Sequence, residues 1–226
     1  MKDKHSLVSD TRDLPWVEVS AGGEQKLLAS ADDQDRFTTS ILRLAPQAAL
    51  PPLSGRDGRE MLVLEGDLDV GTAQLQAGDY ARQPAAADRV ASTRRGCTVF
   101  VKEGPLPESE QEPMHVRTEE APWLPGHGNL SVKTLHSFGS EGTALVHWPA
   151  GERFVSHQHW GGEEILVLSG TFIDEHGHYP AGTWMRSPHL SSHHPFVEEE
   201  TVIFVKTGHL QSAAPQHGVA PSARGF

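Results

Sequence analysis

The segment Glu163–Gly170 reads EEILVLSG, and an earlier segment, Arg59–Gly66, reads REMLVLEG. Five of these eight positions are identical, and the second copy follows the first by 104 residues (163 minus 59). The spacing continues without a gap through later pairs: Ala77 and Ala181, Gly78 and Gly182, Phe100 and Phe204, and Lys102 and Lys206. Chance does not keep one register over so long a stretch, so the sequence predicts two copies of one structural unit.

Short β-prone runs fill both copies. TTSILRLA and TVFVKE in the first copy are typical, because they are rich in β-branched and aromatic residues and lie between turn-forming residues. The 226 residues include 22 Gly and 16 Pro, which suits frequent turns better than long helices. About eight strands per copy would close into a small double-sheet barrel. We therefore predict an all-β protein of two tandem barrels with little helix.

The dipeptides Pro15-Trp16 and Pro122-Trp123 mark equivalent starts of the two copies. We place the domains at 11–104 and 118–210. The connector 104–122 is rich in proline and acidic residues, as expected for an exposed linker. The segment 211–226 is polar and rich in small residues, and we expect it to be a disordered tail.

Charge and cysteine content exclude several classes of function. The net charge of −11 opposes binding to nucleic-acid phosphates or to an anionic membrane surface. A single cysteine, Cys97, excludes an internal disulfide and any site built from several thiolates. No stretch has the roughly 20 apolar residues of a membrane helix, and the first residues do not resemble a signal peptide. These features predict a cytoplasmic protein that binds neither nucleic acid nor membrane.

The second copy contains a set of metal-ligand residues in the sequence GERFVSHQHWGGEE at 151–164. In a strand, His157 and His159 would point to the same side about 7 Å apart, a distance that a metal ion can bridge after modest twist. A turn at Trp160-Gly161-Gly162 would bring Glu163 back beside them, and His193 arrives on a later strand. Three imidazoles and one carboxylate form a complete set of ligands for zinc, iron, manganese or nickel.

This pattern resembles a known family. G-x5-H-x-H-x3-E-x6-G at 151–170 matches the first cupin motif at every position, and Pro180-x-Gly182 followed by His193 is similar to the second. Ten residues separate Gly182 from His193, where two are usual, so His189 and His194 are alternative fourth ligands. The longer string HWGGEEILVLSGTFIDEHGHYPAGTWMRSPHLSSHHPF resembles the cupin-like domain of ChrR-type anti-sigma factors. The resemblance implies a bicupin whose zinc ligands match His157, His159, Glu163 and His193.

The first copy lacks these ligands. Subtracting 104 from their numbers gives Leu53, Gly55, Arg59 and Arg89, none of which is a usual metal ligand. We therefore expect a degenerate first barrel without metal. Arg59 and Arg89 suggest the hypothesis that this barrel grips a carboxylate or phosphate instead. Drift of an abandoned site is the alternative.

The resemblance implies a metal-binding regulatory or sensing module, with one divalent ion per chain, zinc before iron, manganese or nickel. ChrR-type proteins also carry an N-terminal zinc-binding domain that grips the sigma factor. The first 100 residues here contain one cysteine and form a barrel copy, which argues against a sigma-factor partner. The alternative is an enzyme, a metal-dependent dioxygenase acting on a small diketone-like or phenolic substrate. A purely structural ion is a third reading. Cupins often form homodimers, although a bicupin can supply its own partner.

Overall fold

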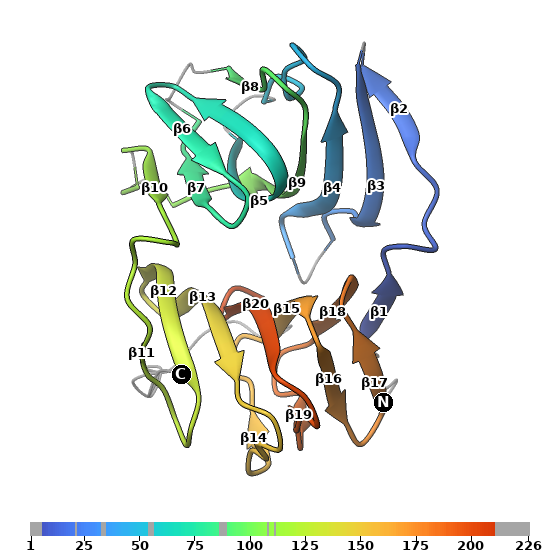
Figure 1. Ribbon diagram of the computed structural model, residues 1–226, viewed down its shortest axis with the longest axis vertical. Helices are drawn as coiled ribbons and strands as arrows, with labels where there is room; N and C mark the ends of the chain where they lie inside the picture. The colour runs from blue at the N-terminus through green and yellow to red at the C-terminus, as the bar shows by residue number, and fades with distance from the viewer. Residues whose placement is uncertain are drawn as a thin grey trace. The chain divides into compact units, whose positions relative to one another are not determined.

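The computed structural model describes residues 6–20, 22–32, 35–53, 57–85, 90–107, 109–110 and 112–210. The chain divides into two compact units (Figure 1). The first barrel takes in Leu14–Asp32 and Arg36–Pro122. The described part of the second barrel consists of residues 123–210 together with Asp35 and residues 6–13 from earlier in the chain. The expected tail at 211–226 lies outside the described residues.

The first barrel is built around a sheet in the order β10-β7-β5-β9-β4-β3-β2, with β6 and β8 paired to β5. All pairs are antiparallel. The strands are β2 (Val17–Ser20), β3 (Gly23–Ala29), β4 (Thr38–Leu44), β5 (Asp57–Val70), β6 (Ala73–Gln76), β7 (Tyr80–Gln83), β8 (Ala91–Ser92), β9 (Cys97–Pro105) and β10 (Met114–Val116).

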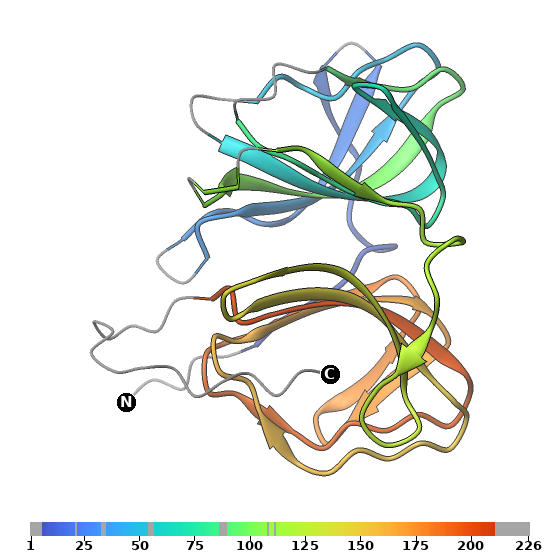
Figure 2. The ribbon, with the colours of Figure 1, turned by 90° about the vertical axis from the view of Figure 1, so that its left-hand side faces the viewer.

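The second barrel has a sheet in the order β1-β18-β15-β20-β13-β12-β11 and two small sheets, β14-β19 and β16-β17. In Figure 2 the strands of each unit curve around their own interior. The strands are β1 (Leu7–Asp10), β11 (Leu124–Pro125), β12 (Ser131–Phe138), β13 (Glu141–Trp148), β14 (His157–Gln158), β15 (Glu163–Ser169), β16 (Thr171–Asp174), β17 (Gly177–Pro180), β18 (Thr183–Ser187), β19 (Ser192–His193) and β20 (Thr201–Thr207).

The repeated segments form β5 and β15, and alternation along each strand explains their sequences. Met61 and Val63 lie in the hydrophobic core of the first barrel. Ile165 and Val167, at the same repeat positions, lie in the core of the second barrel. Successive side chains of a strand point to opposite faces, so alternate apolar residues build one core. The predicted tandem all-β barrels are confirmed, and the described residues contain no helix.

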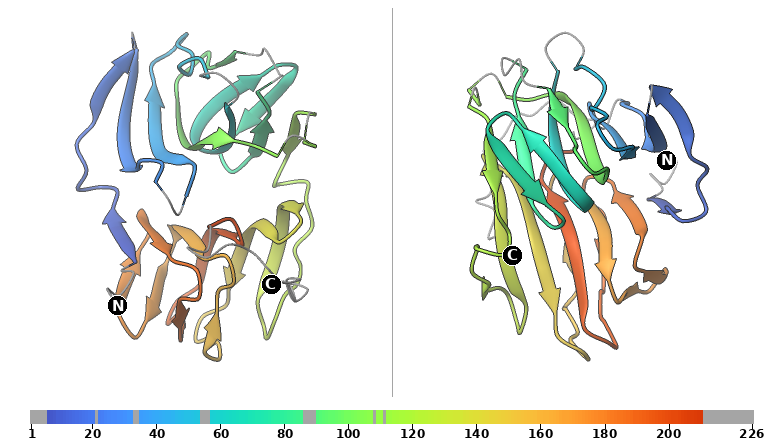
Figure 3. Two further views of the ribbon diagram at one scale, coloured as in Figure 1. Left: turned by 180° about the vertical axis from the view of Figure 1, so that it is seen from behind. Right: turned by 45° about the horizontal axis from the view of Figure 1, so that its top comes forward.

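The leading strand of each repeat belongs to the barrel of the other repeat. β1 pairs with β18 through Leu7↔Arg186, and β10 pairs with β7 through Met114↔Arg82. Figure 3 shows β1, in dark blue, at the edge of the second barrel. After each strand a threonine repeats the same contact: Thr11 Oγ1 donates to Gly182 O at 2.7 Å, and Thr118 Oγ1 donates to Gly78 O at 3.0 Å.

Within the part of the chain that the structure describes, no helix is long and apolar enough to cross a bilayer.

Candidate metal centre

Two very short strands and a glycine turn bring the candidate ligands together. β14 pairs with β19 so that His157 lies opposite His193. The chain then reverses through Gly161 and Gly162, whose φ angles are +77° and +70°. Residues with a Cβ rarely adopt these angles, which explains why the turn needs two glycines. The reversal starts β15 at Glu163, next to the histidines.

The ligand atoms of these residues converge. The nearest ring nitrogens of His157, His159 and His193 all lie within 4.8 Å of one another. His159 Nε2 is 3.0 Å from His193 Nε2, and Glu163 Oε2 lies 3.4 Å from His159 Nε2 and 3.6 Å from His193 Nε2. His159, Glu163 and His193 are buried, whereas His157 is partly exposed. The cluster is therefore accessible on the side of His157.

Burial disfavours the charged forms of these groups. It lowers the pKa of His159 to about 3, with a further contribution from His193. Burial also lowers the pKa of His157 and raises the pKa of Glu163. The neutral imidazoles of His157 and His159, with their lone pairs beside a buried carboxylate, fit a divalent cation, because the ion offsets the cost of burying the carboxylate charge. The residues present therefore fit the metal that the sequence pattern predicts.

The Asp174 carboxylate lies beside the ring nitrogen of His193 that faces away from the other candidate ligands. His193 Nδ1 lies 3.5 Å from Asp174 Oδ2, at the end of β16. Burial opposes the charge on both groups, but their mutual contact lowers the pKa of Asp174 and raises that of His193. Sequence reasoning missed Asp174. A signal was present, because the equivalent position in the first copy is Val70, which has no carboxylate either.

The structure places the two alternative fourth ligands outside the cluster. His189 Nδ1 accepts a hydrogen bond from the Gly161 amide at 2.8 Å, and its ring packs against Trp160 with centroids 4.8 Å apart. His194 is exposed, and its amide donates to Glu175 Oε2 at 2.8 Å. Of the three histidines, His193 is therefore the one that joins His157 and His159.

Aromatic side chains form the inner wall next to the cluster. Phe154 packs edge-on against His157 with centroids 4.9 Å apart, and Phe172 lies 5.9 Å from His193. Trp148 packs against both phenylalanines and is 4 % exposed. The apolar wall limits the rotation of two of the imidazoles and lowers the local dielectric constant, which strengthens electrostatic interactions with the donors.

The first barrel has an internal ion pair where the second has its carboxylate donor. Arg59, at the repeat position of Glu163, is buried, and its Nη2 atom lies 2.9 Å from Glu103 Oε1 and donates to Pro51 O at 2.6 Å. Burial lowers the pKa of Arg59 and raises that of Glu103. An incoming anion would have to compete with Glu103 for the guanidinium. Arg89 and Gly55 lie outside the described residues.

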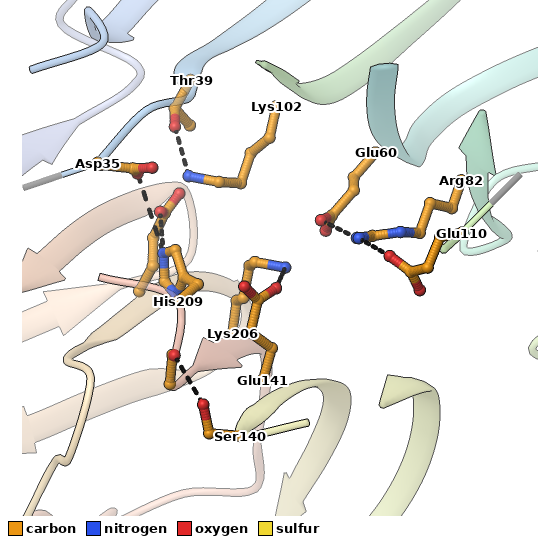
Figure 4. A network of polar contacts seen from close by, with 12 residues as sticks. Asp35, Thr39, Glu60, Arg82, Lys102, Glu110, Ser140, Glu141, Lys206 and His209 are labelled. Carbon is orange, nitrogen blue, oxygen red and sulfur yellow. Dashed lines mark hydrogen bonds and ion pairs between the residues drawn. The ribbon is translucent and has the colours of Figure 1, made fainter. Parts of the chain in front are cut away.

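A second buried cluster in the second barrel joins Asp35, Glu164 and His209 (Figure 4). His209 Nε2 lies 3.3 Å from Glu164 Oε2 and 3.9 Å from Asp35 Oδ2. Arg186 lies 3.7 Å from Asp35, and Trp184 donates to Glu164 at 2.8 Å. Because Arg186 supplies positive charge there, we interpret this cluster as an ion-pair network. Sequence reasoning missed it, because Asp35 lies far from the other two residues in the sequence.

Comparison with known proteins agrees with this architecture. The sequence model of the ChrR cupin-like domain matches twice, at residues 4–107 and 111–211. No match was found among curated protein sequences.

Solved structures share the fold at low sequence identity. A "putative dioxygenase" from Nostoc punctiforme has 17% identity and a TM-score of 0.74, covering 95% of this chain and 88% of its own. A "putative glyoxylate induced protein" from Pseudomonas aeruginosa has 14% identity and a TM-score of 0.78, covering 97% and 94%. Oxalate decarboxylase from Lactobacillus farciminis, in a formate complex, has 12% identity and a TM-score of 0.66, covering 91% and 87%. Together with the doubled family match, the two barrels show that this chain is a bicupin of the ChrR cupin-like domain family.

Proposed function

We propose that the second barrel binds one divalent metal ion through His157, His159, Glu163 and His193, with zinc as the expected metal. The observation that carries this proposal is the convergence of three imidazoles within 4.8 Å of one another, with the Glu163 carboxylate beside them. Three nitrogens and one oxygen satisfy zinc, and iron, manganese or nickel accept the same donors.

We further propose that the chain acts as a metal-dependent regulatory or sensing module. Because four protein donors satisfy zinc, an oxygen atom of a small ligand would reach the ion by displacing one of these donors. The partly exposed edge at His157 gives such a ligand a route to the site. β14 and β19 are each two residues long and form a separate sheet. Few backbone hydrogen bonds hold them, so a change in the metal ligands would readily move this part of the backbone.

The contacts of the Asp174 carboxylate favour a sensing role over catalytic turnover. This carboxylate, which contacts the cluster, is already occupied by His193, by the Tyr179 hydroxyl and by two backbone amides. It is therefore poorly suited to act as a general acid or base. The alternative function, a dioxygenase acting on a diketone-like or phenolic compound, has the same accessible edge in its favour.

Metal analysis of freshly purified protein tests the proposal, with His157→Ala and His159→Ala as test variants and His189→Ala and His194→Ala as matched controls. We expect one zinc ion per chain in the wild type and both controls, and a loss of zinc in the test variants. A wild-type chain that takes up no divalent metal, or controls that lose metal as fully as the test variants, would contradict the proposed ligand set.

Oxygen uptake on a panel of diketones and phenols separates the two functions. The sensing proposal expects zinc and no uptake. Iron in the purified protein, with uptake that disappears in His157→Ala, would replace the sensing proposal by the dioxygenase.

A further inference from the structure

We infer that Asp174 positions His193 so that Nε2, rather than Nδ1, faces the other metal donors. The inference rests on the proposed function, because the orientation of the His193 ring has a purpose only if His193 binds a metal ion. Asp174 Oδ2 lies 3.5 Å from His193 Nδ1, on the opposite side of the ring from His159 Nε2, which is 3.0 Å from His193 Nε2. A carboxylate next to one ring nitrogen keeps the proton there and leaves the lone pair on the other.

The carboxylate is itself held in place. Asp174 Oδ1 accepts hydrogen bonds from the amides of His176 at 2.8 Å and Gly177 at 3.1 Å, and from the Tyr179 hydroxyl at 3.0 Å. All three donors bind the same oxygen, so Oδ2 is directed at His193. The Asp174 side chain is 6% exposed, which limits competition from water. Asp174 is therefore a preorganised positioning residue.

The hairpin of β16 and β17 also holds the backbone around His193. Ile173 and Phe196 exchange two backbone hydrogen bonds, with N···O distances of 3.1 and 2.8 Å. Glu175 Oε2 accepts from the His194 amide at 2.8 Å. One hairpin thus controls both the backbone next to His193 and the orientation of its ring, which the sequence motif alone does not indicate.

The duplicated barrel provides an internal comparison. Subtracting 104 places Val70 at the position of Asp174 and Leu75 at the position of Tyr179. The first barrel has an equivalent hairpin, in which Val70 lies opposite Ala73. Val70 and Leu75 are both buried in its hydrophobic core. The hairpin therefore forms without the carboxylate, and the carboxylate is present in the barrel that has the metal donors. This pattern links Asp174 to the metal centre rather than to the fold.

The test uses the full chain and two readouts. Nitrogen-15 NMR of the metal-free wild type should show His193 protonated at Nδ1, and Asp174→Val should lose this preference. Competition with a chromophoric chelator should show zinc binding about 10- to 100-fold weaker in Asp174→Val. Tyr179→Phe keeps the carboxylate and should give a smaller loss in the same direction. Asp69→Asn, which removes a hairpin carboxylate from the first barrel, should bind zinc as the wild type does.

The outcomes separate the inference from the proposed function. His193 protonated at Nε2 in the metal-free wild type, or wild-type zinc affinity in Asp174→Val, would overturn the inference even if the wild type binds zinc. A wild type that binds no zinc, but whose His193 loses its Nδ1 proton preference in Asp174→Val, would refute the proposed function and still support the positioning. If Asp174→Val fails to fold, Asp174→Asn and Tyr179→Phe carry the same two measurements.

Discussion

Ionisable side chains are buried at equivalent positions of both barrels. Each member of the following repeat-related pairs is at most 7 % exposed: Glu60 and Glu164, Arg82 and Arg186, and Lys102 and Lys206. Their partners differ. In the first barrel Glu60 contacts Arg82, which also contacts Glu110 (Figure 4). In the second barrel Glu164 contacts Trp184 and His209. Burying a charge is costly without a partner, and each barrel supplies its own set of partners to the buried glutamate.

Replacing Arg82 tests this dependence. Arg82→Met leaves Glu60 buried without its closest cation, and loss of one partner of a buried pair costs about 3 kcal/mol. We expect that decrease in the free energy of unfolding, measured by urea denaturation. Arg94→Met removes an exposed guanidinium that pairs with Asp69 and should change stability by less than about 1 kcal/mol. Equal losses in the two variants would contradict the role assigned to burial.

The single thiol is expected to be inert in the folded protein. Cys97 is 5 % exposed, and burial raises the pKa of its thiol to about 11. The thiolate is the reactive form, and the raised pKa leaves little of it near neutral pH. Burial also limits the access of reagents to the sulfur atom. We expect a disulfide reagent at pH 8 to label Cys97 slowly in native protein and completely in guanidinium chloride. Rapid labelling of the folded chain would indicate a more open first barrel.

Because the leading strands are exchanged, a change in β1 is expected to affect the barrel formed by the other repeat. β1 precedes the first repeat but completes the edge of β18 in the second barrel, and β18 pairs with the segment of β15 that begins at Glu163. An edge strand protects the backbone hydrogen bonds of its neighbour. Changes at the start of the chain should therefore be detected next to the candidate metal centre.

Deletion of residues 1–12 provides the measurement. Amide hydrogen exchange should become faster in β18, at residues 183–187, because its partner strand is gone. Exchange in β7, at residues 80–83, should stay at the wild-type rate, since β7 is covered by β10. Faster exchange in β7 with β18 unchanged would show that the leading strand pairs within its own repeat.

At the scale of the whole molecule, the two copies of one barrel differ at the position of the candidate metal centre. The second copy has converging donors with the Asp174 carboxylate beside them, while the first has an Arg59–Glu103 ion pair and apolar residues at the matching positions. Ligand binding stabilises the structure that it contacts. The proposed metal should therefore stabilise the second barrel selectively.

Removal of metal with a chelator tests this prediction. Hydrogen exchange should become faster at the start of β15 and in β19, which contain Glu163 and His193. Exchange in β5 of the first barrel should be unchanged, because Arg59 replaces the donor there. An equal increase in both barrels would mean that the ion supports the molecule as a whole.

The sequence by itself determined the duplication, the all-β class and the order of the candidate ligands. These features are local. An alternating pattern specifies a strand, and the spacing from His157 to Glu163 can be read from the sequence without any knowledge of tertiary contacts. The repeat also predicted which barrel would lack donors, since Arg59 cannot replace a carboxylate ligand.

Only the tertiary structure decided which of three histidines joins His157 and His159, which carboxylate lies beside it, and which barrel each leading strand completes. The pairing of β14 with β19 brings His193 inward and leaves His189 and His194 outside. Asp174 reaches His193 through a hairpin, and β1 reaches β18 across more than 170 residues of chain (Arg186 minus Leu7). Contacts of such long range depend on packing of the complete fold, which no local spacing records.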